Sequence, residues 1–269
     1  MNASPQRPEP LDIVGAGRTH PKFSSYEMSE VEQVARKFVA HVRRIAVTPT
    51  YKEPGSVAWT EVIIDYFCNT RPRGVVVDAR LSRRKPSEPG ALGRGDIQLD
   101  PNLSSLAGKP RDTGGEWLFD LCHATYPSYG ARSKYGKAQY WKDAFSAETP
   151  PRLKLVLESE WGKLASKDLS VHRVFEDACK LLHVCAAVKV VVFASHDKPN
   201  QIETVDLAWA MVQRDETTYF AGKRQLPTSH ERPRRPTWLW IDIPWRWDEQ
   251  KPEAWIFTPA GGALSAPGT

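Results

Sequence analysis

The stretch from residue 152 to residue 194 constrains the fold of this chain more than any other. It holds two apolar runs, RLKLVLESEW at 152–161 and AVKVVVFA at 187–194, and the segment between them carries apolar residues at helical spacing. Short apolar runs of this kind are typical of strands buried in a sheet. Two neighbouring parallel strands need a crossover connection, which is usually a helix. The sequence therefore predicts a strand-helix-strand unit within one sheet.

Elements of the same kinds precede this unit. The first predicted helix begins at Ser29, because Ser29 and Glu32 have the spacing of a capping box. The elements predicted before the unit are helices at 29–47 and 57–68 and strands at 74–80 and 116–124. The core order is thus helix, strand, strand, strand, helix, strand, behind an additional N-terminal helix. We predict an α/β (α+β) fold with a mixed central sheet flanked by helices.

The composition predicts one large domain with polar ends. The chain has 269 residues, of which 41% are hydrophobic and 26% charged, so it can bury a sizeable core. Residues 1–25 are rich in proline and polar side chains and are predicted to form a flexible arm. Residues 259–269 are predicted to form a disordered tail. Within the domain at 26–258, the segment at 236–258 holds five of the ten tryptophans and is expected to be an aromatic appendage.

Several classes of protein are disfavoured. The longest apolar run, at 184–194, is interrupted by Lys189 and falls short of the ~18 residues of a membrane helix. The N-terminus lacks the apolar core of a signal peptide, so we expect a cytoplasmic protein. The four cysteines form no C-x-x-C pair and are expected to be free thiols rather than zinc ligands. No G-x-x-x-x-G-K or G-x-S-x-G motif is present, which disfavours P-loop hydrolases and serine hydrolases.

Three carboxylates interrupt the apolar strands. Glu158 and Glu160 are two residues apart near the end of the 152–161 strand and therefore project from the same face, and Asp120 lies between apolar pairs of the preceding strand. Carboxylates close to a core are costly unless they are paired or bound to a metal. If the strands are neighbours, the three side chains converge, and such hard oxygen ligands suit Mg²⁺ or Mn²⁺. Acids that face solvent or pair with Lys and Arg are the alternative.

The order of these elements resembles a known superfamily. The helix with Glu61, the strand at 74–80, the strands with Asp120 and with Glu158-Ser159-Glu160, and the helix and strand that follow are similar to the core of the PD-(D/E)XK, or restriction-endonuclease-like, nucleases. The resemblance covers residues 57–194. It implies that Asp120 and Glu158 are the two acids of the motif, with Glu61 as an additional helix acid. It further implies divalent-metal-dependent hydrolysis of phosphodiester bonds, usually in DNA, in genome defence, restriction or repair.

The chain departs from that pattern at the lysine that follows the second acid by two residues. Glu160 stands there instead, as a third candidate metal ligand, and Lys180 in the next helix is the candidate for a migrated lysine. A helical projection at 100° per residue, however, puts Lys180 opposite the apolar stripe of its helix, as expected for a solvated surface lysine. The departure leaves a second hypothesis, a catalytically inactive nuclease-fold protein that acts as a nucleic-acid-binding or protein-assembly module.

Basic and aromatic residues are interleaved between the two acidic strands. The net charge of +5 permits a nucleic-acid partner. Basic side chains can contact phosphates, and aromatic rings can stack on unpaired bases. The predicted DNA-binding residues are Arg132, Lys134, Tyr135, Lys137, Tyr140 and Lys142. Solvated loop charge is the alternative. The tryptophans of the 236–258 segment are expected to pack in the core or to contact a second copy or an activating protein partner.

Overall fold

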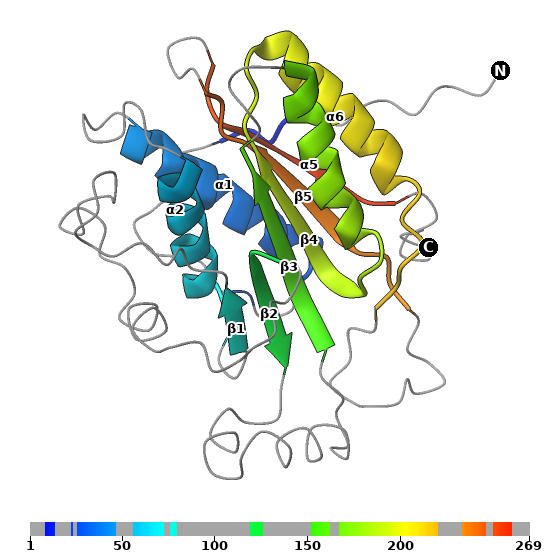
Figure 1. The fold of residues 1–269 in the computed structure, drawn as a ribbon. Helices are drawn as coiled ribbons and strands as arrows, with labels where there is room; N and C mark the ends of the chain where they lie inside the picture. Colours follow the sequence, from blue (N-terminus) through cyan, green and yellow to red (C-terminus); the bar gives the residue numbers. More distant parts are fainter. Residues whose placement is uncertain are drawn as a thin grey trace, which may run out of the picture.

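A six-stranded mixed sheet with helices on both faces forms the centre of the molecule (Figure 1). The computed structural model describes residues 9–13, 23, 26–46, 56–72, 76–79, 119–125, 152–161, 167–219, 233–245 and 250–259. This arrangement confirms the predicted α+β class with a mixed central sheet flanked by helices.

The helices and strands follow the predicted order. The described helices are α1 (Met28–Ala46), α2 (Ser56–Asn69), α5 (Lys167–Leu181) and α6 (Lys198–Val212). The described strands are β1 (Val76–Ala79), β2 (Leu121–Thr125), β3 (Arg152–Glu160), β4 (Ala186–Phe193), β5 (Thr237–Asp242) and β6 (Glu253–Phe257). The second strand thus begins at Leu121, so that Asp120 directly precedes it, and residues 116–118 lie outside the described part.

The start of α1 differs from the predicted capping box. The helix begins at Met28, and the carboxylate of Glu30 accepts a hydrogen bond of 2.9 Å from the backbone N–H of Tyr26. Glu32 instead pairs with Arg36 one turn further along, at 2.6 Å. The spacing of Ser29 and Glu32 was therefore misleading, because a second acid nearby satisfies the helix start.

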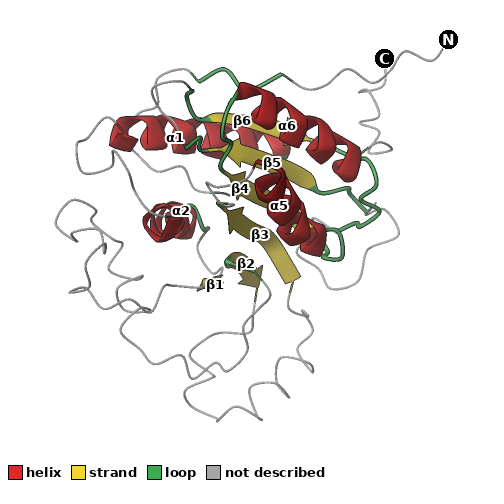
Figure 2. Cartoon of the chain, turned by 45° about the horizontal axis from the view of Figure 1, so that its top comes forward, coloured by secondary structure: helices red, strands yellow, loops and turns green. Residues whose placement is uncertain are grey.

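The strands lie in the sheet in their order along the chain. β1, β2 and β3 form an antiparallel meander, β3, β4 and β5 are parallel, and β6 is antiparallel to β5. Helix α5 connects β3 to β4, as predicted, and α6 lies between β4 and β5 in the chain. Helices α1 and α2 cover one face of the sheet, and α5 and α6 cover the other (Figures 1 and 2).

The tryptophan-rich segment belongs to the sheet and is not an appendage. It supplies β5, which pairs with β4, and β6, which pairs with β5. The side chains of Trp238 and Trp240 have no exposed surface, and Trp255 is 4% exposed. Since both faces of β5 are buried, its residues form a continuous apolar run instead of an alternating pattern. These three rings are therefore unavailable as the predicted contact for a partner protein.

Described residues of the predicted N-terminal arm pack against the domain. The backbone N–H of Leu11 donates to the carbonyl of Ala254 at 2.7 Å. The backbone N–H of Phe23 donates to the carbonyl of Thr70 at 2.9 Å. Phe23 is buried in the same apolar cluster as α1 and α2. In the predicted tail, Pro259 is buried, and residues 260–269 lie outside the described part. None of the described helices combines the length and the apolar character needed to cross a membrane.

A buried ion pair explains the lysine in the middle of β4. The Lys189 ammonium donates to Oδ2 of Asp215 and to Oγ1 of Thr217, each at 2.7 Å. Trp238 Nε1 donates to the same Asp215 oxygen at 2.7 Å. Burial lowers the pKa of Lys189, although the hydrogen bond and charge of Asp215 oppose this effect. Because each charged group has several partners, the pair is compatible with its buried position.

A buried histidine connects three separate parts of the chain. Nε2 of His123, on β2, lies 2.9 Å from the carbonyl of Phe67, which only accepts hydrogen bonds, so Nε2 carries the proton. Nδ1 is then the acceptor, and the Tyr26 hydroxyl donates to it at 3.0 Å. His123 is therefore neutral and links β2 to α2 and to the segment before α1. Burial lowers its pKa to about 4.

Replacement of His123 by Gln should remove a pH-dependent part of the stability. An unfolded histidine titrates near pH 6.5 and the folded His123 at about 4, so the unfolded chain binds the additional proton between these values. Stability present above pH 6.5 is lost as the pH falls toward 4. From pH 7 to pH 4, the difference in unfolding free energy between wild type and His123→Gln should fall by about 3 kcal/mol. Urea unfolding measures it, with exposed His172→Gln as the control; a pH-independent difference would contradict this assignment.

Removal of both members of the buried pair should cost less stability than the two single removals added together. Asp215→Ala leaves the Lys189 charge buried without its carboxylate and should lower the unfolding free energy by about 3–5 kcal/mol. Lys189→Met/Asp215→Ala leaves no buried charge and should be less destabilised than the two single variants added together. Urea unfolding at pH 7 measures all three variants, and strictly additive losses would mean that the two side chains are energetically independent.

Candidate functional site

The ends of β2 and β3 bring two of the predicted acids together. Leu121, the first residue of β2, pairs with Leu157 on β3 in an antiparallel register, so Asp120 directly precedes the paired part of β2, beside the end of β3. Asp120 Oδ2 also accepts hydrogen bonds from the backbone N–H and the Oγ of Ser159, at 2.9 and 2.7 Å. The structure thus places the Asp120 carboxylate against Ser159, the residue that follows Glu158 on β3.

Glu158 faces the side of the sheet that α5 and α6 cover. Val156, two residues earlier on β3, belongs to the apolar cluster under these helices, and alternation puts Glu158 on the same face. Its side chain is 5% exposed. A carboxylate in such surroundings requires a cation or donors nearby to remain ionised.

Lys180 supplies a cation to this pair. Its ammonium lies 3.9 Å from Oε1 of Glu158 and donates a hydrogen bond to Oδ1 of Asp177, one turn earlier on α5. Partial burial lowers the pKa of Lys180. The Asp177 hydrogen bond and the charges of Glu158, Asp177 and Asp120 more than offset this, so its pKa is raised. The charge of Asp120 is one of the causes that raise the pKa of Lys180, so Asp120 also lies in the neighbourhood of this ammonium.

The helical projection did not anticipate the contact between Lys180 and Glu158. The side chain of Lys180 is 39% exposed and also reaches the sheet. A projection considers only the direction of Cβ, whereas the long aliphatic stem of lysine allows its ammonium to lie far from that direction. Lys180 is therefore both a partly solvated residue and a neighbour of the acids.

The other two predicted acids are less completely described. Glu160 lies on the same face as Glu158 by alternation, half-buried, with its Cα in register with Phe193 of β4. Glu61 lies within α2, but its side chain is outside the described residues. Trp161 Nε1 donates to Oγ1 of Thr60 at 3.0 Å, which brings this part of α2 to the end of β3. The backbone of Glu61, next to Thr60, therefore lies near the end of β3.

The donor set at this position fits a hard divalent cation with few protein ligands. Among the residues that the structure describes, no group of three or more His, Cys, Asp or Glu side chains is close enough to hold a metal. Mg²⁺ commonly uses one or two carboxylates and completes its shell with water and substrate phosphates. Asp120 and Glu158 are the two described carboxylates near the end of β3 that could take this part.

Sequence reasoning missed two residues that contact the predicted site. Ser159 lies between the two glutamates, and its hydrogen bonds to Asp120 depend on the β2–β3 register. Asp177 precedes Lys180 by three residues, a spacing at which side chains meet on a helix surface. That spacing was a usable signal for Asp177, whereas Ser159 gave none.

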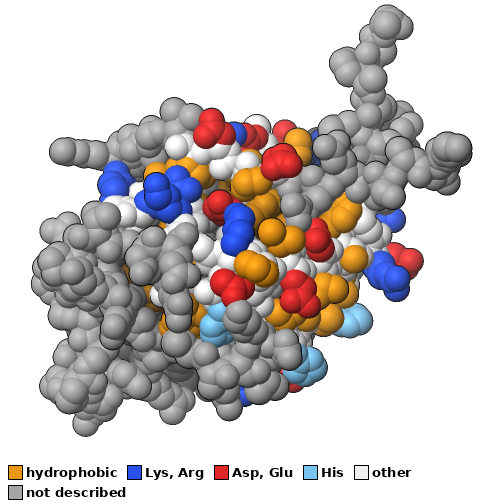
Figure 3. All heavy atoms as spheres, turned by 90° about the horizontal axis from the view of Figure 1, so that it is seen from above, with side chains coloured by type: hydrophobic (Ala, Val, Ile, Leu, Met, Phe, Trp, Pro, Cys, Tyr) orange, Lys and Arg blue, Asp and Glu red, His pale blue; other side chains and the backbone are white. Residues whose placement is uncertain are grey.

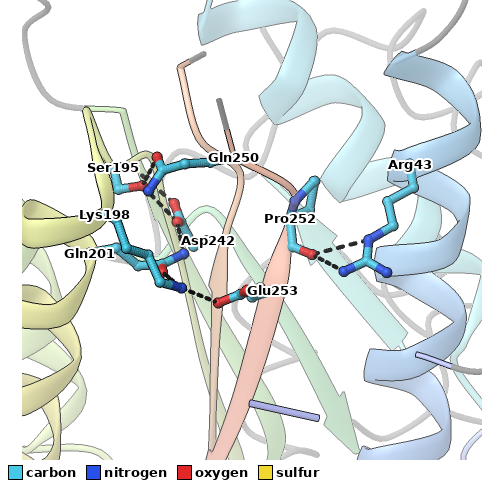
Figure 4. Close-up of polar contacts among 8 residues, drawn as sticks. All are labelled: Arg43, Ser195, Lys198, Gln201, Asp242, Gln250, Pro252 and Glu253. Atoms are coloured by element: carbon cyan, nitrogen blue, oxygen red, sulfur yellow. Dashed lines mark hydrogen bonds and ion pairs between the residues drawn. The ribbon is translucent and has the colours of Figure 1, made fainter. Parts of the chain in front are cut away.

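A second polar cluster lies at the ends of β4 and β5 (Figure 4). Oγ and N–H of Ser195 donate to the carboxylate of Asp242 at 2.6 and 2.9 Å, and Gln201 Nε2 donates to it at 2.5 Å. Burial raises the pKa of Asp242 to about 6, against the opposing effect of these donors. Ser195 and Asp242 have no exposed surface. The cluster joins the two strand ends to α6 and offers no surface to a substrate.

The predicted DNA-binding residues Arg132, Lys134, Tyr135, Lys137, Tyr140 and Lys142 lie outside the described residues. On the face drawn in Figure 3, acidic, basic and apolar side chains of the described residues are interspersed. The described residues of this face therefore give no direct support for a nucleic-acid contact.

Comparison with known proteins gives no relative for this chain: no family model, no protein of curated function and no solved structure matches it. The functional assignment accordingly depends on the side chains of the site.

Proposed function

We propose that this protein is a divalent-metal-dependent nuclease that hydrolyses phosphodiester bonds, with DNA as its substrate. The observation that carries the proposal is the buried Glu158 paired with Lys180 of α5, next to Ser159, which holds the Asp120 carboxylate. The order of elements and the position of the two acids agree with the PD-(D/E)XK resemblance, which supports the same assignment.

Each residue has a defined part in this proposal. Asp120 and Glu158 would hold Mg²⁺ or Mn²⁺, with Glu160 or Glu61 as further candidates. Bound there, the cation would supply activation of water and neutralisation of charge on the phosphate. Ser159 orients the Asp120 carboxylate through its two hydrogen bonds. The Lys180 ammonium, positively charged at neutral pH and 39% exposed, can stabilise negative charge on phosphate oxygens.

DNA as substrate is supported by the sequence. The chain has a net charge of +5, and basic and aromatic residues are interleaved at 129–142, between the two acidic strands. Such a segment can follow a phosphate backbone and stack on bases that have come out of a duplex.

Isosteric replacement of either strand acid should abolish metal-dependent cleavage. Asp120→Asn and Glu158→Gln keep the side-chain volume and remove the charge that would bind the cation, so the rate should fall by at least about 100-fold. The assay uses plasmid, linear duplex and single-stranded DNA, each with Mg²⁺, Mn²⁺ or EDTA. The matched control is Glu176→Gln, an exposed acid on α5.

The result distinguishes between the two hypotheses raised in the sequence analysis, the nuclease and the catalytically inactive module. Cleavage that persists in both variants would exclude this site. Salt-sensitive DNA binding without cleavage on any substrate would instead favour the catalytically inactive nucleic-acid-binding module.

The hydroxyl of Ser159 should increase the affinity of the proposed site for the cation. Ser159→Ala removes the 2.7 Å hydrogen bond to Asp120 and keeps the bond from the backbone N–H. Loss of a partner that orients a ligand typically weakens metal binding by about 10- to 100-fold. Mn²⁺ titration followed by electron paramagnetic resonance measures the affinity; Ser159→Thr should recover most of it, and exposed Ser29→Ala should have no effect. Equal affinity in Ser159→Ala and wild type would show that Asp120 needs no such support.

A further inference from the structure

One ammonium group is shared by two carboxylates of different elements. Lys180 Nζ donates a hydrogen bond to Asp177 on its own helix, and it lies 3.9 Å from Oε1 of Glu158 on the sheet. The second distance is longer than a hydrogen bond. The ammonium is therefore hydrogen-bonded to Asp177 and forms a longer ion pair with Glu158.

The two carboxylates differ in their surroundings. The Glu158 side chain is 5% exposed, whereas that of Asp177 is 25% exposed. The attraction between an ammonium and a carboxylate is stronger where water is excluded. Without a competing group on α5, Lys180 would therefore be expected to move toward Glu158 and form a direct ion pair.

Such a pair would oppose metal binding. If Glu158 is a ligand, a cation at the site competes with the Lys180 ammonium for the same oxygen. In the position that Asp177 gives it, the Lys180 ammonium makes no hydrogen bond with Oε1 of Glu158 and keeps a positive charge close to the site.

We propose that Asp177 is a positioning residue, which holds the Lys180 ammonium away from Glu158 and thereby sets the affinity of the Asp120–Glu158 site for a divalent cation. This inference rests on the proposed function for its metal. It adds a regulatory residue on α5 that touches neither the cation nor the substrate.

Mn²⁺ affinity in four variants tests the proposal. The affinity of Asp177→Asn should be about tenfold weaker than that of wild type, because Lys180 then pairs with Glu158. Lys180→Met should bind Mn²⁺ more tightly than wild type, since the competing charge is gone. In the Lys180→Met background, Asp177→Asn should have little further effect, because Asp177 acts through Lys180. Glu176→Gln, next to Asp177 and exposed, controls for the loss of one negative charge on α5.

A second measurement needs no metal. The coupling energy between Glu158 and Lys180 comes from urea unfolding of Glu158→Gln, Lys180→Met and the double variant. This coupling should increase when Asp177 is replaced by Asn, because the two charges then come into contact.

The outcomes separate the inference from the proposed function. An equal loss of Mn²⁺ affinity on Asp177→Asn with and without Lys180, or an unchanged coupling energy, would overturn the positioning role. An increased coupling energy in a protein that binds no Mn²⁺ would support the positioning role and overturn the metal-dependent nuclease.

Discussion

The parallel centre of the sheet imposes one constraint on the rest of the molecule: strands buried on both faces can carry a charge only where another element supplies its partner. β3, β4 and β5 each carry one buried ionisable residue on the face covered by α5 and α6, namely Glu158, Lys189 and Asp242. Lys189 receives its partner from the loop after α6, and Asp242 from Ser195 and α6. The helices of this face are thus positioned by polar contacts as well as by apolar burial.

Glu158 differs from the other two in the nature of its counter-charge. The Lys189–Asp215 pair has no exposed side-chain surface, and its atoms are 2.7 Å apart. Lys180, in contrast, is 39% exposed and lies 3.9 Å from Glu158. A closed pair is consistent with a structural role, because neither group can exchange its partner for a ligand. A partly exposed cation at a longer distance is held less tightly than a closed pair, which is the property that the proposed metal site requires.

The sequence predicted those features that depend on local periodicity. The helical stripes and the short apolar runs gave the order of elements, and the isolated acids of the apolar strands pointed to Asp120 and Glu158. The errors concern contacts between distant parts of the chain. Trp238, Trp240 and Ile243 indicate a strand, but β5 pairs with β4 across a whole helix, and no local pattern shows that this segment belongs to the sheet and is not an appendage. Ser159 contacts Asp120 only because of the β2–β3 register, which no local pattern encodes.

The ammonium near Glu158 comes from a helix residue, Lys180, and this location affects how the site can behave. A lysine at position 160 would project from the same buried strand as Glu158, where its ammonium could move only with the strand. Lys180 approaches from α5 on a long, half-exposed side chain, so its ammonium can change position while the sheet remains fixed. This arrangement leaves position 160 to a third carboxylate, Glu160, on the same face. In the proposed site, the positive charge near Glu158 is therefore a movable one on the helix and not one fixed on the strand.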